Sequence, residues 1–334
     1  MRTREKRDER TKPTPFEDAV TAYGRGDYAT ALELFRPVAE RGDAAAQYNL
    51  GFLYDTGRGV PQDLAEAVAW FTKAAEQGYT GAQYKLGVMY GSGRGVPRDE
   101  AMALTWLRMA AERNHAGAQY HLGLIHDAGR GVPQDAVEAT KWFRKAANQN
   151  NASAQYNLGV MYAKGDGVPA NPAEAVTWYR KAANQIHAGA QYNLGVIYAS
   201  GQGVPRDFRE ALKWFHKAAE QGSASAQYNL GVMSAKGRGV RQDPVEAARW
   251  YRRAADLGNA NAQYNLGVMC QTGEGVRQDD VDAYKWFTLA ASFFPEAMAA
   301  TRELALRNRD DVAARMTAAQ VAEAEERVRT WAQE

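Results

Sequence analysis

The sequence predicts an all-α protein built as a solenoid of stacked helix pairs. The first observation is a repeat: the string Ala-Gln-Tyr begins at Ala46 and recurs every 36 residues as far as Ala262, seven times and without an insertion. The second is that each copy holds two segments with helical spacing of apolar residues, separated by a glycine-rich loop. A fixed period in this range is typical of stacked supersecondary units, each of which buries its apolar face against its neighbours.

The chain opens on a charged leader, residues 1–15, which reads MRTREKRDERTKPTP. No apolar segment follows the charges, so the leader is not a secretory signal as written. A short charged tract buries too little apolar area to order itself, and we expect residues 1–15 to be disordered. A basic docking arm is the alternative, although Glu5, Asp8 and Glu9 dilute its positive charge.

Residues 16–41 are predicted to form an N-terminal capping hairpin of two helices. Phe35 precedes Phe71 by 36 residues, which places the second helix of the hairpin in register with the repeats that follow. Pro37 falls inside that helix, where it removes a backbone hydrogen bond and is expected to bend the helix.

Residues 42–292 hold the seven repeats, and each repeat begins with a helix such as Ala-Gln-Tyr-Asn-Leu-Gly-Val-Met-Tyr, from Ala154 to Tyr162. Its apolar residues recur at three- and four-residue steps on more than one side of the helix, so neighbouring helices have to cover it. The tyrosine that ends this motif is replaced by His126, Ser234 and Cys270 in the third, sixth and seventh copies, where we expect looser packing.

A glycine-rich loop and a second helix complete each repeat. The first glycine of the loop, Gly57 in the first copy, suits a left-handed residue that ends the first helix. Asp63 is predicted to cap the second helix, and Glu66 three residues later gives the spacing of a capping box. One tryptophan per second helix, Trp70 in the first copy, is expected to lie in the core. The equivalent caps are Asp99, Asp135, Asn171, Asp207, Asp243 and Asp279.

Residues 293–334 are predicted to form C-terminal capping helices. Thr317 and Gln320 have capping-box spacing, which would start a last helix that runs to about Trp331. The many charges of this segment fit the polar outer surface that the end of a solenoid needs.

The Ala-Gln-Tyr-Asn-Leu-Gly-x-x-Tyr helix, the Gly-x-Gly-Val loop and the Glu-Ala-x-x-Trp-Tyr-x-Lys-Ala-Ala helix resemble Sel1-like repeats, a subclass of the TPR superfamily. The resemblance covers about residues 16–292. It implies a right-handed α-solenoid with a concave groove, used as a non-enzymatic scaffold or adaptor for other proteins. Some Sel1-like proteins carry a cysteine pair in each repeat and have been described as binding β-lactams. Cys270 is the only cysteine of this chain, so that property does not transfer.

Three features invite a chemical interpretation, and each has a simpler one. The loop after Gly91 is glycine-rich like a phosphate loop, but no Gly-Lys-Ser/Thr follows it. His115, His121 and His126 do not share one helix face, and no cysteine or glutamate completes a zinc site. Cys270 replaces a packing tyrosine and is expected to be a small buried residue rather than a nucleophile. We therefore expect no enzyme activity, no metal and no cofactor; a hydrolase is the least favoured alternative.

The concave groove is the candidate binding site, because the resemblance implies that the first helix of each pair lines it. Side-chain amides both donate and accept hydrogen bonds, so stacked asparagines could bind the backbone of an extended peptide. Lys85 and His121 would bias the N-terminal half towards acidic or polar ligands, and Tyr84, Tyr156 and Tyr192 would add aromatic contacts. The alternative is that these residues only bridge adjacent repeats. The tyrosine column is Tyr48, Tyr84, Tyr120, Tyr156, Tyr192, Tyr228 and Tyr264, and the asparagine column is Asn49, Lys85, His121, Asn157, Asn193, Asn229 and Asn265.

The composition limits the partners. A net charge of +2, from 41 basic and 39 acidic residues, gives no global field for nucleic acid, although the local cluster of Arg249, Arg252 and Arg253 keeps that class as an alternative. No apolar run of about 18 residues is present, so no membrane insertion is expected. We expect a monomeric, cytoplasmic protein that binds a protein or peptide. The alternative is an exported envelope or assembly factor, periplasmic or secreted, if the N-terminus is processed or misassigned.

Overall fold

The computed structural model describes residues 13–331, and over this range the chain forms eighteen α-helices, one short 3-10 helix and no strand. The all-α prediction is confirmed. Thr14 and Pro15, which the sequence places in the leader, already start the first helix, because Thr14 and Glu17 form a reciprocal capping box. Residues 1–12 of the expected disordered leader lie outside the described range.

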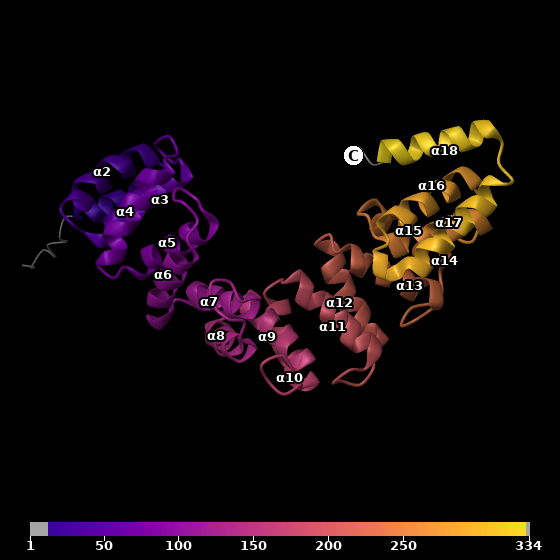
Figure 1. Cartoon of the computed structure of the whole chain (residues 1–334), viewed down its shortest axis with the longest axis horizontal. Coiled ribbons are helices and arrows are strands. Elements are labelled where there is room, and N and C mark those ends of the chain that lie inside the picture. Colours follow the sequence, from indigo (N-terminus) through magenta and orange to yellow (C-terminus); the bar gives the residue numbers. More distant parts are fainter. Residues whose placement is uncertain (1–12, 332–334) are drawn as a thin grey trace, which may run out of the picture. The chain divides into compact units, whose positions relative to one another are not determined.

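The chain divides into two compact units, and the boundary falls in the fourth repeat. Figure 1 labels most of the helices of both. The first unit runs to Leu158 and also holds Asp166–Pro169; the second holds Gly159–Gly165 and continues from Ala170. The first unit contains α1 (Pro15–Gly24), α2 (Tyr28–Glu40), α3 (Ala44–Thr56), α4 (Leu64–Glu76), α5 (Thr80–Ser92), α6 (Glu100–Glu112), α7 (Ala116–Ala128) and α8 (Ala136–Asn148), and α9 (Ala152–Lys164) carries the boundary. The second contains α10 (Pro172–Asn184), α11 (Ala188–Ser200), α12 (Phe208–Glu220), α13 (Ala224–Lys236), α14 (Pro244–Asp256), α15 (Ala260–Thr272), α16 (Asp280–Phe293), the 3-10 helix (Glu296–Met298), α17 (Ala299–Ala313) and α18 (Ala318–Trp331).

A glycine on each first helix lets a large side chain of the second helix pack against its backbone. In the fifth repeat, a Cβ atom built on Gly195 would lie 2.5 Å from Cδ1 of Phe215, which is too close for any side chain. The buried ring of Phe215 therefore fills the space that a side chain would take. The same pairing recurs as Gly51–Phe71, Gly87–Leu107, Gly123–Phe143, Gly159–Tyr179, Gly231–Tyr251 and Gly267–Phe287.

The second helices are capped as predicted, but the capping box is not formed. Asp63 accepts a hydrogen bond from the backbone N–H of Glu66 at 3.0 Å, and its own backbone N–H donates to the Tyr54 carbonyl at 3.1 Å. Because that N–H is already satisfied, Glu66 does not reach back to it. Glu66 instead accepts a 2.8 Å hydrogen bond from the indole of Trp70.

The glycine-rich loop joins each repeat to the one before it. The first glycine ends the first helix with a positive φ, 67° at Gly57, as predicted. The second glycine has a role that the sequence pattern did not reveal. A Cβ atom on Gly95 would lie 2.7 Å from the carbonyl oxygen of Leu64, the first residue of α4, so this loop packs directly on the preceding repeat.

The buried glutamine of each Ala-Gln-Tyr string forms a second link between repeats that was not predicted. Gln47 donates from Nε2 to the carbonyl oxygen of Ala39 at 3.0 Å, which satisfies the end of the preceding helix. Its Oε1 accepts from Nε2 of Gln77 at 2.7 Å. The bond to the carbonyl eight residues earlier recurs for Gln83, Gln119, Gln155, Gln191, Gln227 and Gln263.

The tryptophans lie in the core or at its edge, as expected. Trp70, Trp178, Trp214 and Trp286 are buried, and the others are half-buried. A lysine on the same helix covers the ring in most repeats, as where Nζ of Lys73 lies 3.9 Å from the Trp70 ring centre.

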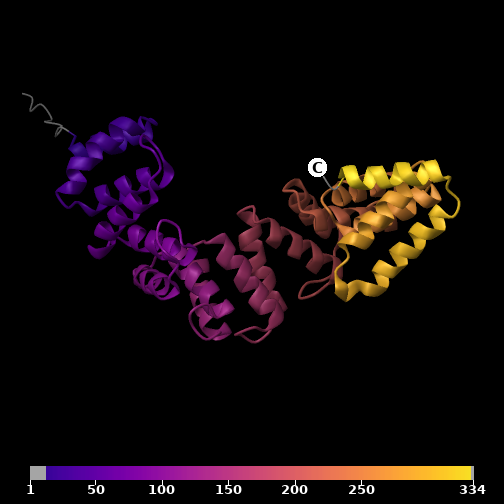
Figure 2. The ribbon, with the colours of Figure 1, turned by 45° about the horizontal axis from the view of Figure 1, so that its top comes forward.

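The last two helices depart from the repeat geometry. α17 and α18 diverge from the turn that joins them, and α18 lies along α16 instead (Figure 2). Arg315 forms two hydrogen bonds of 2.7 Å with Asp280 on α16, and Trp331 packs edge-on against Phe293. Thr317 and Gln320 form the predicted cap at the start of α18.

Candidate partner-binding surface

The first helices present a shared surface in each unit, which we call the first-helix face. It consists of the tyrosine column, the asparagine column and the apolar residue three positions after each asparagine-column residue. That apolar residue is half-buried in six repeats and is most exposed at Val196, where 36% of its surface is accessible. The apolar positions are Phe52, Val88, Leu124, Val160, Val196, Val232 and Val268.

The tyrosine column is half-buried and packs across each repeat. Tyr192 lies 6.0 Å from Phe215 between ring centres, and Tyr48 packs in the same way on Phe71 at 5.6 Å. Burial raises the pKa of Tyr48, Tyr84 and Tyr228, so these hydroxyls stay protonated. Because the tyrosines are half-buried, only part of their surface is available to a ligand.

The asparagine column is half-buried at all seven positions and fully buried at none. Asn49 and Asn229 each donate from Nδ2 to the carbonyl oxygen four residues earlier in their own helix, at 2.9 Å. The amide of Asn265 lies beside the hydroxyls of Tyr228 and Tyr251, which belong to the preceding repeat, and it partly offsets the rise that burial causes in the pKa of both. At this last position the amide bridges repeats, as the alternative interpretation of the column expects.

Lys85 and His121 are also engaged by the preceding repeat. Nζ of Lys85 lies 3.4 Å from Oδ2 of Asp55, so this lysine charge is compensated within the chain. Nε2 of His121 lies 3.3 Å from the hydroxyl oxygen of Tyr84. Burial, with a smaller contribution from His115, lowers the pKa of His121, which is therefore neutral at pH 7. Neither residue offers the free positive charge that the sequence suggested.

Two recesses on the first-helix face occupy the same place in the repeat, one in each unit. The first is lined by residues of α5, α6 and α7 and has a volume of about 210 Å³. The second is lined by residues of α13, α14 and α15 and has a volume of about 340 Å³. The lining residues correspond as Val88 and Val232, Gly91 and Ala235, Ser92 and Lys236, Leu107 and Tyr251, His121 and Asn265, and Arg130 and Glu274. In both units a recess lies where two first helices and a loop meet, and the residues at the equivalent positions determine its charge and polarity.

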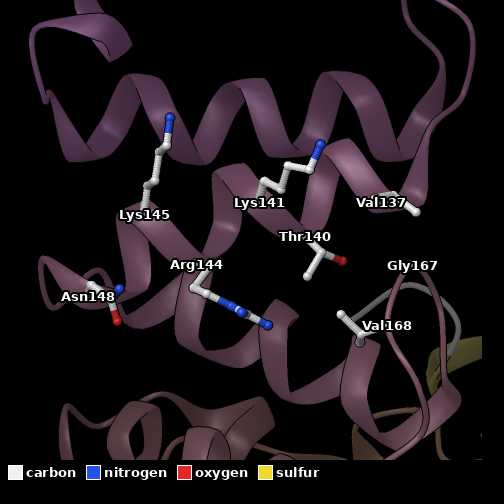
Figure 3. Close-up of a pocket in the computed structure, with 8 residues that line it drawn as sticks. All are labelled: Val137, Thr140, Lys141, Arg144, Lys145, Asn148, Gly167 and Val168. Atoms are coloured by element: carbon white, nitrogen blue, oxygen red, sulfur yellow. The ribbon is translucent and has the colours of Figure 1, made fainter.

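A third recess, of about 380 Å³, lies on the second helix α8 and not on the first-helix face (Figure 3). Arg144 extends towards the loop that carries Gly167 and Val168, while Lys141 and Lys145 point away from that loop. Lys141 is paired with Glu138 at 3.0 Å, and Lys145 covers the ring of Trp142 at 4.0 Å. The two lysines of this basic recess are therefore engaged in contacts of the repeat itself.

Two chemical candidates can be checked among the described residues, a cluster of metal ligands and the thiol of Cys270. Between residues 13 and 331, no group of three or more His, Cys, Asp or Glu side chains is arranged to hold a metal ion. Cys270 is only 2% exposed, and burial raises the pKa of its thiol to about 11. A thiol in that state is a packing residue, as predicted, and a poor nucleophile.

Comparison with known proteins agrees with the repeat architecture. Seven consecutive segments match the family model described as Sel1 repeat: residues 44–79, 80–115, 116–151, 152–187, 188–223, 224–259 and 260–292. The chain belongs to the Sel1 repeat family. Proteins with these repeats generally mediate protein–protein interactions and are typically non-enzymatic.

Two solved structures resemble this Sel1 repeat protein over most of its length. The crystal structure of a Sel1 repeat protein from Oxalobacter formigenes is 36% identical, with a TM-score of 0.66 over 86% of each chain. The structure of c5321, described as a protective antigen present in uropathogenic Escherichia coli strains, is 29% identical, with a TM-score of 0.56 over 96% of this chain and 91% of the other. Both support the assignment of the fold.

Two curated relatives match only a short segment. They are proteins named DAP3-binding cell death enhancer 1 from Mus musculus and Rattus norvegicus, each 32% identical. The match covers 17% of this chain and 15% of each relative, so the chain spans a small part of their length. Among residues 13–331, no helix has the length and apolar character needed to cross a membrane.

Proposed function

We propose that this Sel1 repeat protein is a scaffold or adaptor that binds a segment of a partner protein along its first-helix face. The observation that carries the proposal is the recess repeated at equivalent positions in the two units. Apolar positions of the first-helix face contribute to the walls of each recess, Val88 in the first and Val232 and Val268 in the second, and an asparagine-column residue lines each one. Such a surface offers apolar contacts and hydrogen-bonding groups side by side, which is the composition of a protein interface.

The second-helix surface is a weaker candidate. Its lysines are placed over tryptophan rings or paired with glutamates of the same helix, as at Lys73 and Lys213. Exposed pairs of this kind stabilise a helix only slightly and leave the surface strongly hydrated. The name of the curated relatives includes binding to a protein, DAP3, which is consistent with an adaptor role for the shared repeats.

Affinity capture from the cells that produce the protein tests the proposal. Wild type is compared with a triple variant in which Asn193, Asn229 and the recess residue Asn265 are replaced by alanine, after circular dichroism and thermal unfolding show that both fold. A triple variant that replaces Lys145, Lys181 and Lys217 by alanine on the second helices is the matched control. A protein retained by wild type and by the control but lost from the asparagine variant supports the proposal. A protein lost only from the lysine variant contradicts the assignment to the first-helix face.

A further inference from the structure

The junction between the first and second repeats shows how this scaffold holds a carboxylate. Asp55, at the end of α3, is only 4% exposed. Nη2 of Arg94, from the next loop, lies 2.9 Å from its Oδ1 and donates to its backbone carbonyl at 3.1 Å. Nζ of Lys85 lies 3.4 Å from Oδ2 on the other side. The side chain of Asp55 fills the space where two first helices and a loop meet.

The junction between the second and third repeats has the equivalent basic positions but no carboxylate. Counting 36 residues on from Asp55, Lys85 and Arg94 leads to Gly91, His121 and Arg130. Gly91 has no side chain to fill the space, and all three residues line the 210 Å³ recess of the first unit. A Cβ atom on Gly91 would meet nothing closer than Cβ of Ala103 at 3.6 Å, so the space is open to a side chain.

The charges of this recess suit an incoming anion. Arg94 neutralises Asp55, whereas Arg130 forms no side-chain ion pair or hydrogen bond among residues 13–331. The recess also contains Arg98 and Glu100, which pair with each other and so leave Arg130 as the uncompensated charge. Its walls are aliphatic, from Val88, Leu107 and Ile125.

The equivalent recess of the second unit lacks this net positive charge. It carries Glu274 in the place of Arg130, Asn265 in the place of His121 and Lys236 in the place of Ser92. A carboxylate placed there would face the like charge of Glu274 as well as the charge of Lys236, so no net positive charge favours it. The two recesses therefore share a place in the repeat and differ in net charge.

We infer that the recess at Gly91 binds an acidic side chain, with an aliphatic neighbour, from an extended segment of a partner protein. The incoming carboxylate takes the place that Asp55 occupies one repeat earlier and pairs with Arg130. The aliphatic neighbour lies on Val88 and Ile125. The inference rests on the proposed function, and it names the chemistry that one recess selects.

A peptide display experiment tests this assignment. A randomised twelve-residue library is selected on the full chain, and enriched sequences are synthesised and titrated by fluorescence anisotropy. Wild type is compared with Arg130→Gln, which removes the charge, and with Gly91→Asp, which supplies the carboxylate from within. Ala235→Asp makes the same change in the recess of the second unit and is the matched control. Thermal unfolding confirms that each variant is folded.

The inference predicts peptides in which an aspartate or glutamate adjoins an aliphatic residue. Arg130→Gln and Gly91→Asp should each weaken their binding by roughly ten-fold or more, since a charge-assisted pair is lost or displaced, while Ala235→Asp leaves it unchanged. Peptides without an acidic residue, or acidic peptides that bind Arg130→Gln as tightly as wild type, would overturn the inference and leave the proposed function standing. A library that yields no binder at all would overturn the inference and also contradict the proposed function.

Discussion

Gln227 lies buried at the junction between the fifth and sixth repeats with half of its amide satisfied. Its Nε2 donates to the Ala219 carbonyl, but its Oε1 has no partner within the described chain. One repeat earlier, Oε1 of Gln191 accepts from Nε2 of Gln221 at 2.6 Å. The residue that corresponds to Gln221 is Leu257. Replacing Leu257 by glutamine should supply the missing donor and stabilise the junction.

The magnitude follows from three contributions. A buried acceptor without a partner costs about 1–3 kcal/mol. Ordering the new glutamine side chain opposes this by up to about 2 kcal/mol. Leu257 is 55% exposed, so little apolar burial is lost. The backbone needs no adjustment, since Leu257 has φ −89° and ψ 14°, and Gln221 has φ −91° and ψ 13°. The net gain in unfolding free energy should be about 1 kcal/mol.

Hydrogen exchange of the α13 amides measures this gain locally, which matters because repeat proteins open in segments. Leu257→Glu is the control, because glutamate matches glutamine in size and brings no donor to Oε1 of Gln227. Gln221→Leu is the reverse change and should destabilise its own junction by a similar amount. Equal protection in Leu257→Gln and Leu257→Glu would refute the reasoning.

Two further predictions concern acid sensitivity and packing. Nδ1 of His115 and of His187 accepts the N-cap hydrogen bond of α7 and α11, and burial lowers the pKa of both residues. The folded state therefore binds fewer protons than the unfolded state. The free energy of unfolding should fall by about 1 kcal/mol per cap as the pH drops below about 6.5. The double variant His115→Asn and His187→Asn keeps both caps and should flatten the unfolding free energy between about pH 7 and 5 in denaturant titrations; an unchanged slope would contradict this. Gly195→Ala should destabilise by about 1–3 kcal/mol, because its Cβ would lie 2.5 Å from Phe215. Gly91→Ala should instead stabilise its helix by up to about 1 kcal/mol, because the new Cβ would meet no atom closer than 3.6 Å. Equal effects of Gly195→Ala and Gly91→Ala on the free energy of unfolding would refute the packing argument.

The sequence predicts those parts of the fold that depend on near neighbours in the chain. The Asp63 cap, the left-handed Gly57 and the start of α18 at Thr317 all follow from residues within one turn of each other. The 36-residue register also predicts which residues are equivalent. It does not show which equivalent positions meet across a junction, because that depends on the offset between stacked helices.

The candidate site shows this limit most clearly. Lys85 was expected to face a ligand, but it pairs with Asp55 of the preceding repeat. The same offset brings Arg130 and His121 to the space above Gly91, three residues that no local motif links. Gln47 and Gly95 stand at invariant positions of the repeat, which signals importance, yet their contacts across the junction appear only in the structure.

Site-specific photo-crosslinking in the cells that produce the protein tests the central claim most directly. A photoreactive phenylalanine analogue is placed at Val196, the most exposed apolar residue of the first-helix face, or at Val245 on the second helix α14. Val245 is the more accessible of the two, at 49% against 36% for Val196, so low exposure cannot explain a missing crosslink there. The account predicts a discrete crosslinked protein from Val196 and none from Val245. A crosslinked protein obtained from Val245 and absent from Val196 would contradict the claim that partners bind the first-helix face.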